Sequence, residues 1–259
     1  MPQCPNCSTE LKGAYCSACG QQSIYPGDLS ARRFFHELAD EVATLRFKFT
    51  TIRSLRALLS PGLLTTEFVA GRRQRYLSPI KLYFVCAALF FLAAPLAGFK
   101  LTSLIADDPS GNLMRLVAAR ARESGLDQAL FSQRFDVRVQ PVYTLALGTG
   151  VIAVALMLQL LFRQAFPFGA HVIFALHYYS FLYLVTAAAG ASRRFGLLDD
   201  VAAALAIGLI TPYLFIAVNR VYRGSVPSVF LKSVTLLFVT FAFNYVADAG
   251  AIRLTLALL

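Results

Sequence analysis

Four cysteines near the start of the chain have the spacing of a metal site. Cys4 and Cys7 form one pair, and Cys16 and Cys19 form a second pair after an eight-residue interval. Two cysteines separated by two residues bind one metal ion from a single tight turn, and two such turns supply the four soft ligands that zinc prefers. A closed four-thiolate site leaves no open position for a substrate. We therefore predict a structural zinc ion, with iron in a rubredoxin-like site as the alternative metal.

The cysteine usage also predicts a compartment and a local backbone. Paired free thiols are typical of a reducing cytoplasm rather than of a disulfide framework, so the N-terminus is expected to be cytoplasmic. Gly20 and Asn6 are residue types that tolerate the positive φ angles of metal-binding turns. The fifth cysteine, Cys86, stands alone in an apolar stretch and is expected to be a packing residue.

A second candidate site is a polar belt inside an otherwise apolar stretch, formed by His177, Tyr178 and Tyr179. These side chains could line a cavity or bind a lipid headgroup, and the alternative is a hydrogen bond across a helix interface. No Asp or Glu falls inside the spans predicted below, which argues against proton-coupled transport. No Gly-rich phosphate loop, zinc-protease motif or nucleophile elbow is recognisable, so no enzyme activity is predicted.

A basic run precedes the first apolar stretch and is formed by Arg72, Arg73, Arg75 and Tyr76. Arginines at this position fix the topology of a membrane protein, or they bind lipid phosphates with tyrosine at the headgroup level. Both interpretations are open from the sequence. Glu67 is a candidate ion-pair partner for Arg72 or Arg73.

The composition places most of the chain in a membrane. Of its 259 residues 57% are hydrophobic and 15% are charged, whereas soluble domains contain about 25% charged residues. We predict an all-α membrane bundle of about five transmembrane helices, each near the roughly 20 residues that cross a bilayer. The predicted spans are residues 80–98, 141–162, 170–190, 201–218 and 229–246. Residues 249–259 are apolar but too short to cross, and they are expected at the surface or against the bundle.

Three segments follow from these patterns: a zinc knuckle or ribbon with its linker (1–27), a juxtamembrane segment (28–79), and a transmembrane domain (80–259) that contains a polar loop (99–140). Apolar residues recur at helical spacing over 29–59 and predict a basic amphipathic helix. Such a helix lies along a membrane, or it packs on the protein or on a second copy. Short helices are expected within the loop at 113–121 and 127–135.

The distribution of basic residues predicts the orientation. More Lys and Arg lie on the side of the N-terminus than on the opposite side, although Arg193 and Arg194 fall on the latter. The positive-inside rule then favours a multi-pass protein of the cell (inner) membrane with a cytoplasmic N-terminus. Most of the net charge of +10 lies beside apolar spans, where it meets lipid headgroups, so nucleic acid is not an expected partner.

The segment before the first span resembles a known pattern, carried by Pro61-Gly62, Glu67-Phe68, Gly71-Arg72-Arg73, Tyr76, Pro79 and Tyr83. It is similar to the signature of an uncharacterised bacterial membrane family with Pro-Gly, Glu-Tyr, Gly-Lys-Arg, Tyr, Pro and Tyr in this order. The chain departs from it at Phe68 and Arg72. The opening cysteines resemble the zinc-ribbon modules of bacterial membrane proteins. The resemblance covers residues 1–95 and implies a zinc ribbon before a multi-pass domain, but no activity.

Two functions are expected from this organisation, and a third, a membrane enzyme acting on lipid, has only the basic run before the first span in its support. The first is an integral membrane adaptor or regulatory scaffold whose zinc ribbon engages a cytoplasmic protein. The alternative is a small transporter, channel or lipid-handling protein with a regulatory ribbon. Membrane lipid and a cytoplasmic protein are the expected partners, and homo-oligomer formation is left open.

Overall fold

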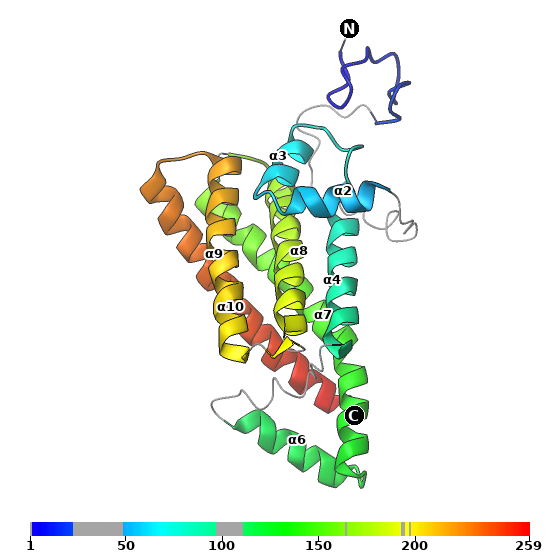
Figure 1. The fold of residues 1–259 in the computed structure, drawn as a ribbon, viewed down its shortest axis with the longest axis vertical. Helices are drawn as coiled ribbons and strands as arrows, with labels where there is room; N and C mark the ends of the chain where they lie inside the picture. The colour runs from blue at the N-terminus through cyan, green and yellow to red at the C-terminus, as the bar shows by residue number, and fades with distance from the viewer. Residues whose placement is uncertain (1, 23–48, 97–110, 164, 193–194, 197) are drawn as a thin grey trace.

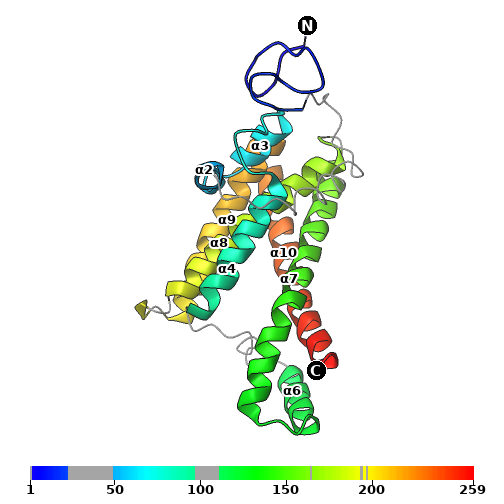
Figure 2. The same cartoon turned by 90° about the vertical axis from the view of Figure 1, so that its right-hand side faces the viewer.

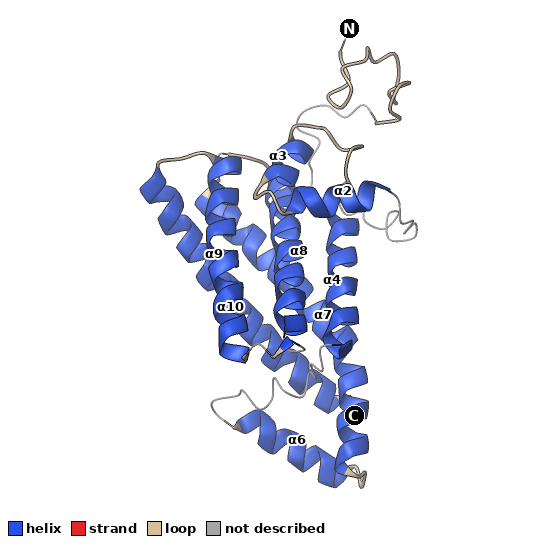
Figure 3. Cartoon of the chain, viewed as in Figure 1, coloured by secondary structure: helices blue, strands red, loops and turns tan. Residues whose placement is uncertain are grey.

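The structure, a computed structural model, describes residues 2–22, 49–96, 111–163, 165–192, 195–196 and 198–259. Within these ranges the secondary structure is helical, apart from turns and two isolated β-bridges, Gln3 with Glu10 and Tyr15 with Gln22 (Figure 3). The linker and the first part of the predicted amphipathic helix, residues 23–48, lie outside the described residues. The end of that predicted helix is observed as α2.

The described helices follow one another along the chain as α2 (Phe49–Leu58), α3 (Leu63–Val69), α4 (Pro79–Leu96), α6 (Asn112–Glu123), α7 (Gln128–Leu161), α8 (Phe168–Ser192), α9 (Asp199–Tyr222) and α10 (Val226–Ala257). In Figure 2, α4, α8 and α9 form one layer, and α7 and α10 cross each other beside it. Helix α8 is central, because 72% of its most apolar window is buried inside the protein, against 33% or less for α7, α9 and α10.

Four of these helices are long and apolar enough to cross a membrane: α7, α8, α9 and α10. Large apolar side chains on their outer faces are exposed, such as Leu156, Leu205 and Phe238, as expected for surfaces that face lipid rather than water. Both findings are consistent with a multi-pass membrane protein. Helix α4 coincides with the first predicted span but is a shorter apolar helix of 18 residues.

Helices α2 and α3 lie across the end at which α4 begins, on the side of the N-terminal knuckle (Figure 1). The hydroxyl of Ser54 in α2 accepts from the amide of Leu77 at 2.8 Å and donates to the carbonyl of Thr50 at 2.7 Å. Because Leu77 lies two residues before α4, this side chain ties α2 to the turn that starts α4. The first predicted span therefore begins at the end of the bundle that the juxtamembrane helices α2 and α3 cover.

Helices α7 and α10 extend beyond the predicted spans at the opposite end of the molecule. Pro141, the expected start of the second span, lies inside α7, which begins at Gln128. The helix continues through the proline because an apolar stripe on its first turns is buried in a small separate core with the end of α10, formed by Phe131, Phe135, Val139, Ile252 and Leu256. The predicted short helix at 127–135 is thus the start of α7, whereas the one at 113–121 is observed as α6. Residues 249–257 continue α10.

Candidate metal centre and its docking segment

The four N-terminal cysteines converge on one point. All four sulfur atoms lie within 4.8 Å of one another, with Cys4 Sγ 3.7 Å from Cys19 Sγ and Cys7 Sγ 3.5 Å from Cys16 Sγ. Four bonds of about 2.3 Å in a tetrahedron separate sulfur atoms by roughly 3.8 Å, so the cluster has the dimensions of a four-thiolate zinc site. The residues present therefore fit a metal ion. Cys86 is buried in α4 and takes no part.

The knuckle is built from one turn used twice at an interval of twelve residues. The amide of Ser8 donates to the carbonyl of Cys4 and the amide of Gly20 donates to that of Cys16, both at 2.8 Å. Ser8 and Gly20 follow the second cysteine of each pair and have φ angles of 62° and 70°. The prediction for Gly20 is confirmed. The second residue with positive φ is Ser8 rather than Asn6, because the left-handed position comes after the second cysteine in both turns.

The thiols differ in their surroundings. Hydrogen bonds with Thr9 lower the pKa of Cys7 to about 6, and desolvation raises the pKa of Cys19 to about 11. A thiolate is the form that binds a metal, so Cys7 is ready to ligate at neutral pH while Cys19 must lose a proton as the ion binds. A bound ion supplies the positive charge that holds the four thiolates together.

The side chain of Gln21 fastens the knuckle to the loop that follows α3. Its Nε2 donates to the carbonyl of Gly71 at 2.7 Å, and its Oε1 accepts from the amide of Arg73 at 3.2 Å. Gln21 is only 4% exposed, so both polar ends of a buried amide are satisfied by this loop. Burying an amide without partners is costly, and the pair of hydrogen bonds therefore specifies one docked position.

Two further contacts support the docked position. Gly71 has a φ of 85°, and a Cβ at this residue would lie 3.0 Å from Cγ of Pro5. A residue without a side chain is therefore needed both for the backbone conformation and for the close approach of the knuckle. Arg75 Nη2 donates to the carbonyl of Asn6 at 3.3 Å. Pro5, Asn6 and Gln21 thus lie on the face of the knuckle that contacts the loop after α3, in the juxtamembrane segment.

The predicted basic run has partners within the protein. Arg72 makes a two-pronged ion pair with Glu67, with Nε–Oε2 and Nη2–Oε1 distances of 2.7 and 2.6 Å. Hydrogen bonding to Arg72 lowers the pKa of Glu67, and the same contact raises that of Arg72. The guanidinium of Arg73 lies 4.8 Å from the ring centroid of Phe68. These contacts show how the arginines of the run are held within the protein. The binding of lipid phosphate by the arginines and by Tyr76 stays a prediction.

The turn between α2 and α3 packs closely against α9. Gly62 has a φ of 73°, and a Cβ there would lie 2.9 Å from the carbonyl oxygen of Ala217. Arg220 Nη1 donates to the carbonyl of Pro61 at 2.8 Å, and the hydroxyl of Tyr213 donates to that of Leu58 at 2.8 Å. The last carbonyl of α2, at Leu58, and the carbonyl of Pro61 in the turn thus both find donors on α9, where a helix end would otherwise leave its carbonyls unpaired.

Helix α3 reaches the predicted polar belt of α8. Thr65 Oγ1 and His177 Nδ1 are 2.9 Å apart, and both residues are buried. Tyr179 points elsewhere and donates from its hydroxyl to Asn244 Oδ1 of α10 at 3.1 Å. The ring of Tyr178 is buried beside that of Tyr179. The structure therefore uses His177 and Tyr179 to join different helices, as in the hydrogen-bonding alternative, and a direct functional role stays a prediction.

One functional candidate was missed. Because α10 runs to Ala257, Asp248 lies inside a candidate span, and Asp136 lies inside the candidate span of α7, which corrects the expectation that no acidic residue does. The carboxylate of Asp248 lies close to the side chain of Tyr143 of α7, and its Oδ1 is buried with no partner among the described residues. An ionisable group at such a position is a default functional candidate. The predicted fifth span ended at Val246, two residues before Asp248, so Asp248 was not recognised as lying inside a span. The apolar pattern of residues 249–257 was the feature of the sequence that indicated a longer helix.

Comparison with known proteins gives one match. A family model described as a protein of unknown function (DUF3667) matches residues 49–91. No curated protein and no solved structure matches the chain. The matched range holds α2, α3 and the first part of α4, including the pattern from Pro61 to Tyr83 that carried the sequence resemblance, but not the four N-terminal cysteines. Over this segment the chain is similar to a family without an established function.

Proposed function

We propose that the protein is an integral membrane adaptor or regulatory scaffold that uses its metal knuckle to engage a cytoplasmic protein. The observation that carries the proposal is the Gln21 clamp on Gly71 and Arg73. A module on a free linker would sample many orientations, and each partner would have to order it. A docked module presents one preorganised surface and lowers that ordering cost.

The surface left free by docking is the hairpin between the two cysteine pairs. Tyr15 in this hairpin is 63% exposed, and Glu10, Lys12 and Ala14 are exposed near it. Docking uses Pro5, Asn6 and Gln21 instead. Exposed aromatic side chains on a rigid frame are the residue type most enriched in binding hot spots, so Tyr15 is the expected centre of the contact.

The finer features of the proposal follow the sequence analysis. The ion is zinc, the protein crosses the cell (inner) membrane of a bacterium five times with α4 as the first span, and the knuckle side is cytoplasmic. The knuckle, α2 and α3 lie at one end of the bundle (Figure 1), which is the arrangement this topology requires. The alternative of a lipid-handling protein has its own support in the groove described below.

The test compares the proteins that co-purify with the full-length chain in mild detergent. We expect one partner to be retained by the unchanged protein and by Cys86→Ser, which leaves the metal site intact. The partner should be lost with Cys16→Ser, which also loses the metal, and with Tyr15→Ala, which keeps one ion per chain. The same protein list from all four, or no partner from any, would remove the adaptor proposal.

A further inference from the structure

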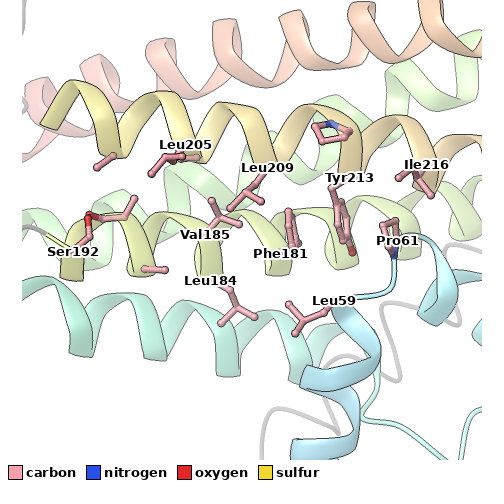
Figure 4. A pocket seen from close by; sticks show the side chains of 15 residues that line it. Leu59, Pro61, Phe181, Leu184, Val185, Ser192, Leu205, Leu209, Tyr213 and Ile216 are labelled. Carbon is pink, nitrogen blue, oxygen red and sulfur yellow. The ribbon is translucent and has the colours of Figure 1, made fainter. Parts of the chain in front are cut away.

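An apolar groove of about 580 Å³ runs along the outer side of α8 and α9. It extends from Ser192 at one end to Leu59 and Pro61, in the α2–α3 turn, at the other (Figure 4). Apart from Ser192 and the hydroxyl of Tyr213, the side chains that line it are aliphatic or aromatic. We name this feature the α8–α9 groove.

Small side chains keep the groove open. Both walls carry alanines at the positions where the helices would otherwise interlock, namely Ala188 and Ala189 on α8 and Ala202 and Ala206 on α9. Leu205 and Leu209 point into the groove and are each 57% exposed. Toward the knuckle the helices come together, because Phe181 stacks on Tyr213 with ring centroids 3.5 Å apart. The hollow is thus part of how α8 and α9 pack.

The dimensions and the lining fit one hydrocarbon chain. At a rise of about 1.5 Å per residue, the stretch of α9 from Ala202 to Ile216 is roughly 21 Å long. Half of a bilayer's hydrocarbon core is about 15 Å thick, so the groove is long enough for an acyl chain that spans one leaflet. A volume of about 580 Å³ also falls in the range of ligand cavities. A water-soluble ligand would find almost no hydrogen-bonding group along this length.

Two arginines stand at the knuckle end of the groove. Arg220 is one helical turn beyond Ile216 on the same face of α9, and its Nη1 donates to the carbonyl of the groove residue Pro61 at 2.8 Å. Arg56 is exposed in the last turn of α2, three residues before the groove residue Leu59 in the turn that follows. The Arg220 guanidinium therefore lies where a chain seated in the groove would reach the level of the headgroups, and Arg56 precedes the same end of the groove in the sequence.

We propose that the α8–α9 groove holds one acyl chain of an anionic phospholipid whose phosphate is bound by Arg220 and Arg56. The apolar lining of the groove favours an acyl chain over a polar ligand. Two cations at one end favour a negative headgroup and orient the lipid with that headgroup toward the knuckle. A guanidinium has five N–H donors, so Arg220 can bind Pro61 and a phosphate together. No knuckle residue lines the groove, and the site stands independently of the adaptor proposal.

The experiment uses the full-length protein in detergent with phosphatidylglycerol or phosphatidylcholine that carries a photoreactive diazirine in one acyl chain. Peptide mapping after irradiation locates the label. We expect phosphatidylglycerol to label the walls of the groove in preference to phosphatidylcholine. Ala206→Phe fills the groove and should lower this labelling several-fold, whereas Ala203→Phe, three positions earlier on α9 and not among the residues that line the groove, should leave it unchanged.

A second variant tests the headgroup and does not depend on how Ala206→Phe folds. Arg220→Gln keeps an N–H donor for Pro61 but removes the charge, and it should weaken phosphatidylglycerol binding by about fivefold, the effect of one cation near a membrane surface. Phosphatidylcholine labelling should not change, and Arg115→Gln, on α6 at the other end of the molecule, should change neither. Label spread evenly over α7, α9 and α10, or equal labelling by both lipids in the unchanged protein, would overturn the proposal.

Discussion

Replacing Gln21 with alanine should release the knuckle from the membrane domain without unfolding it. The change removes two hydrogen bonds, to the carbonyl of Gly71 at 2.7 Å and from the amide of Arg73 at 3.2 Å. The backbone carbonyl of Gln21, which accepts from the amide of Cys16 inside the knuckle, is kept by alanine. At about 1 kcal/mol for each hydrogen bond, the docked state loses roughly 2 kcal/mol, which is about a thirtyfold shift in the docking equilibrium.

Two readouts on the metal-loaded protein measure this shift. Hydrogen exchange at the amide of Arg73 should accelerate by about thirtyfold, because exchange follows the population of the open state. The amide of Arg73 also loses its acceptor directly, so a second site is needed. Tryptic cleavage after Arg75 serves this purpose, since that guanidinium binds the carbonyl of Asn6 in the docked state, and its rate should rise by a similar factor.

The controls separate undocking from unfolding. Gln3→Ala removes an exposed glutamine on the knuckle and should change neither readout. Cys16→Ser, which loses the ion, sets the upper limit for both. If Gln21→Ala retains the metal and cleavage after Arg75 stays at the rate of the unchanged protein, the clamp does not hold the knuckle, and the reasoning from these two hydrogen bonds is refuted.

Two further predictions concern the segment on which the knuckle docks. Gly62→Ala should lower the free energy of unfolding by about 3 kcal/mol, because a left-handed backbone with a Cβ costs about 1–2 kcal/mol and that atom would lie 2.9 Å from the carbonyl of Ala217. Gly111→Ala, at a φ of 63° and with no atom of the described residues within 4 Å of the added Cβ, should cost only the backbone part of about 1–2 kcal/mol. Equal melting temperatures of the two variants in detergent would contradict this. Because Arg72 lowers the pKa of Glu67 below its usual value of 4.5, the stability from this pair is complete at neutral pH and is lost as the pH falls through the lowered pKa. The melting temperature of Glu67→Gln should therefore lack the acid-dependent step of the unchanged protein, and parallel profiles of the two proteins would show that the pair contributes nothing.

The features that the sequence predicted well are local or periodic. Two cysteines separated by two residues can close a metal-binding turn whatever the rest of the chain does, and the four sulfur atoms are within 4.8 Å of one another as expected. The apolar stretches likewise located the helices α4, α7, α8, α9 and α10 in order, because each must be long and apolar in itself to lie in a membrane. These properties depend on neighbours in the sequence, and a single sequence is enough to recognise them.

The features that were missed depend on contacts between distant residues. Gln21 has the sequence context of a linker, and only its position opposite Gly71, fifty residues away, makes it a clamp. Pro141 normally predicts a helix boundary, but the packing of Phe135 against the end of α10 keeps α7 continuous through it. Asp248 was placed outside the last span because the apolar residues 249–257 were judged too short to cross by themselves, whereas Ile252 and Leu256 pack against the start of α7 and continue α10.

The range matched by the family model, residues 49–91, is the part of the chain on which the knuckle and the bundle meet. Its loop receives the knuckle through Gln21, and its seven-residue helix α3 carries Thr65 to His177 of α8. A substitution that moves both the loop and α3 would therefore change the contacts of the knuckle and of the bundle together. Gln21→Ala changes only the knuckle and Ala206→Phe changes only the bundle, and both residues lie outside the matched range. A loss of partner binding caused by the first alone, or of lipid binding caused by the second alone, would show that the two sites work separately. If either variant affected both, the loop, α3 and α8 would be the shortest connected path between them.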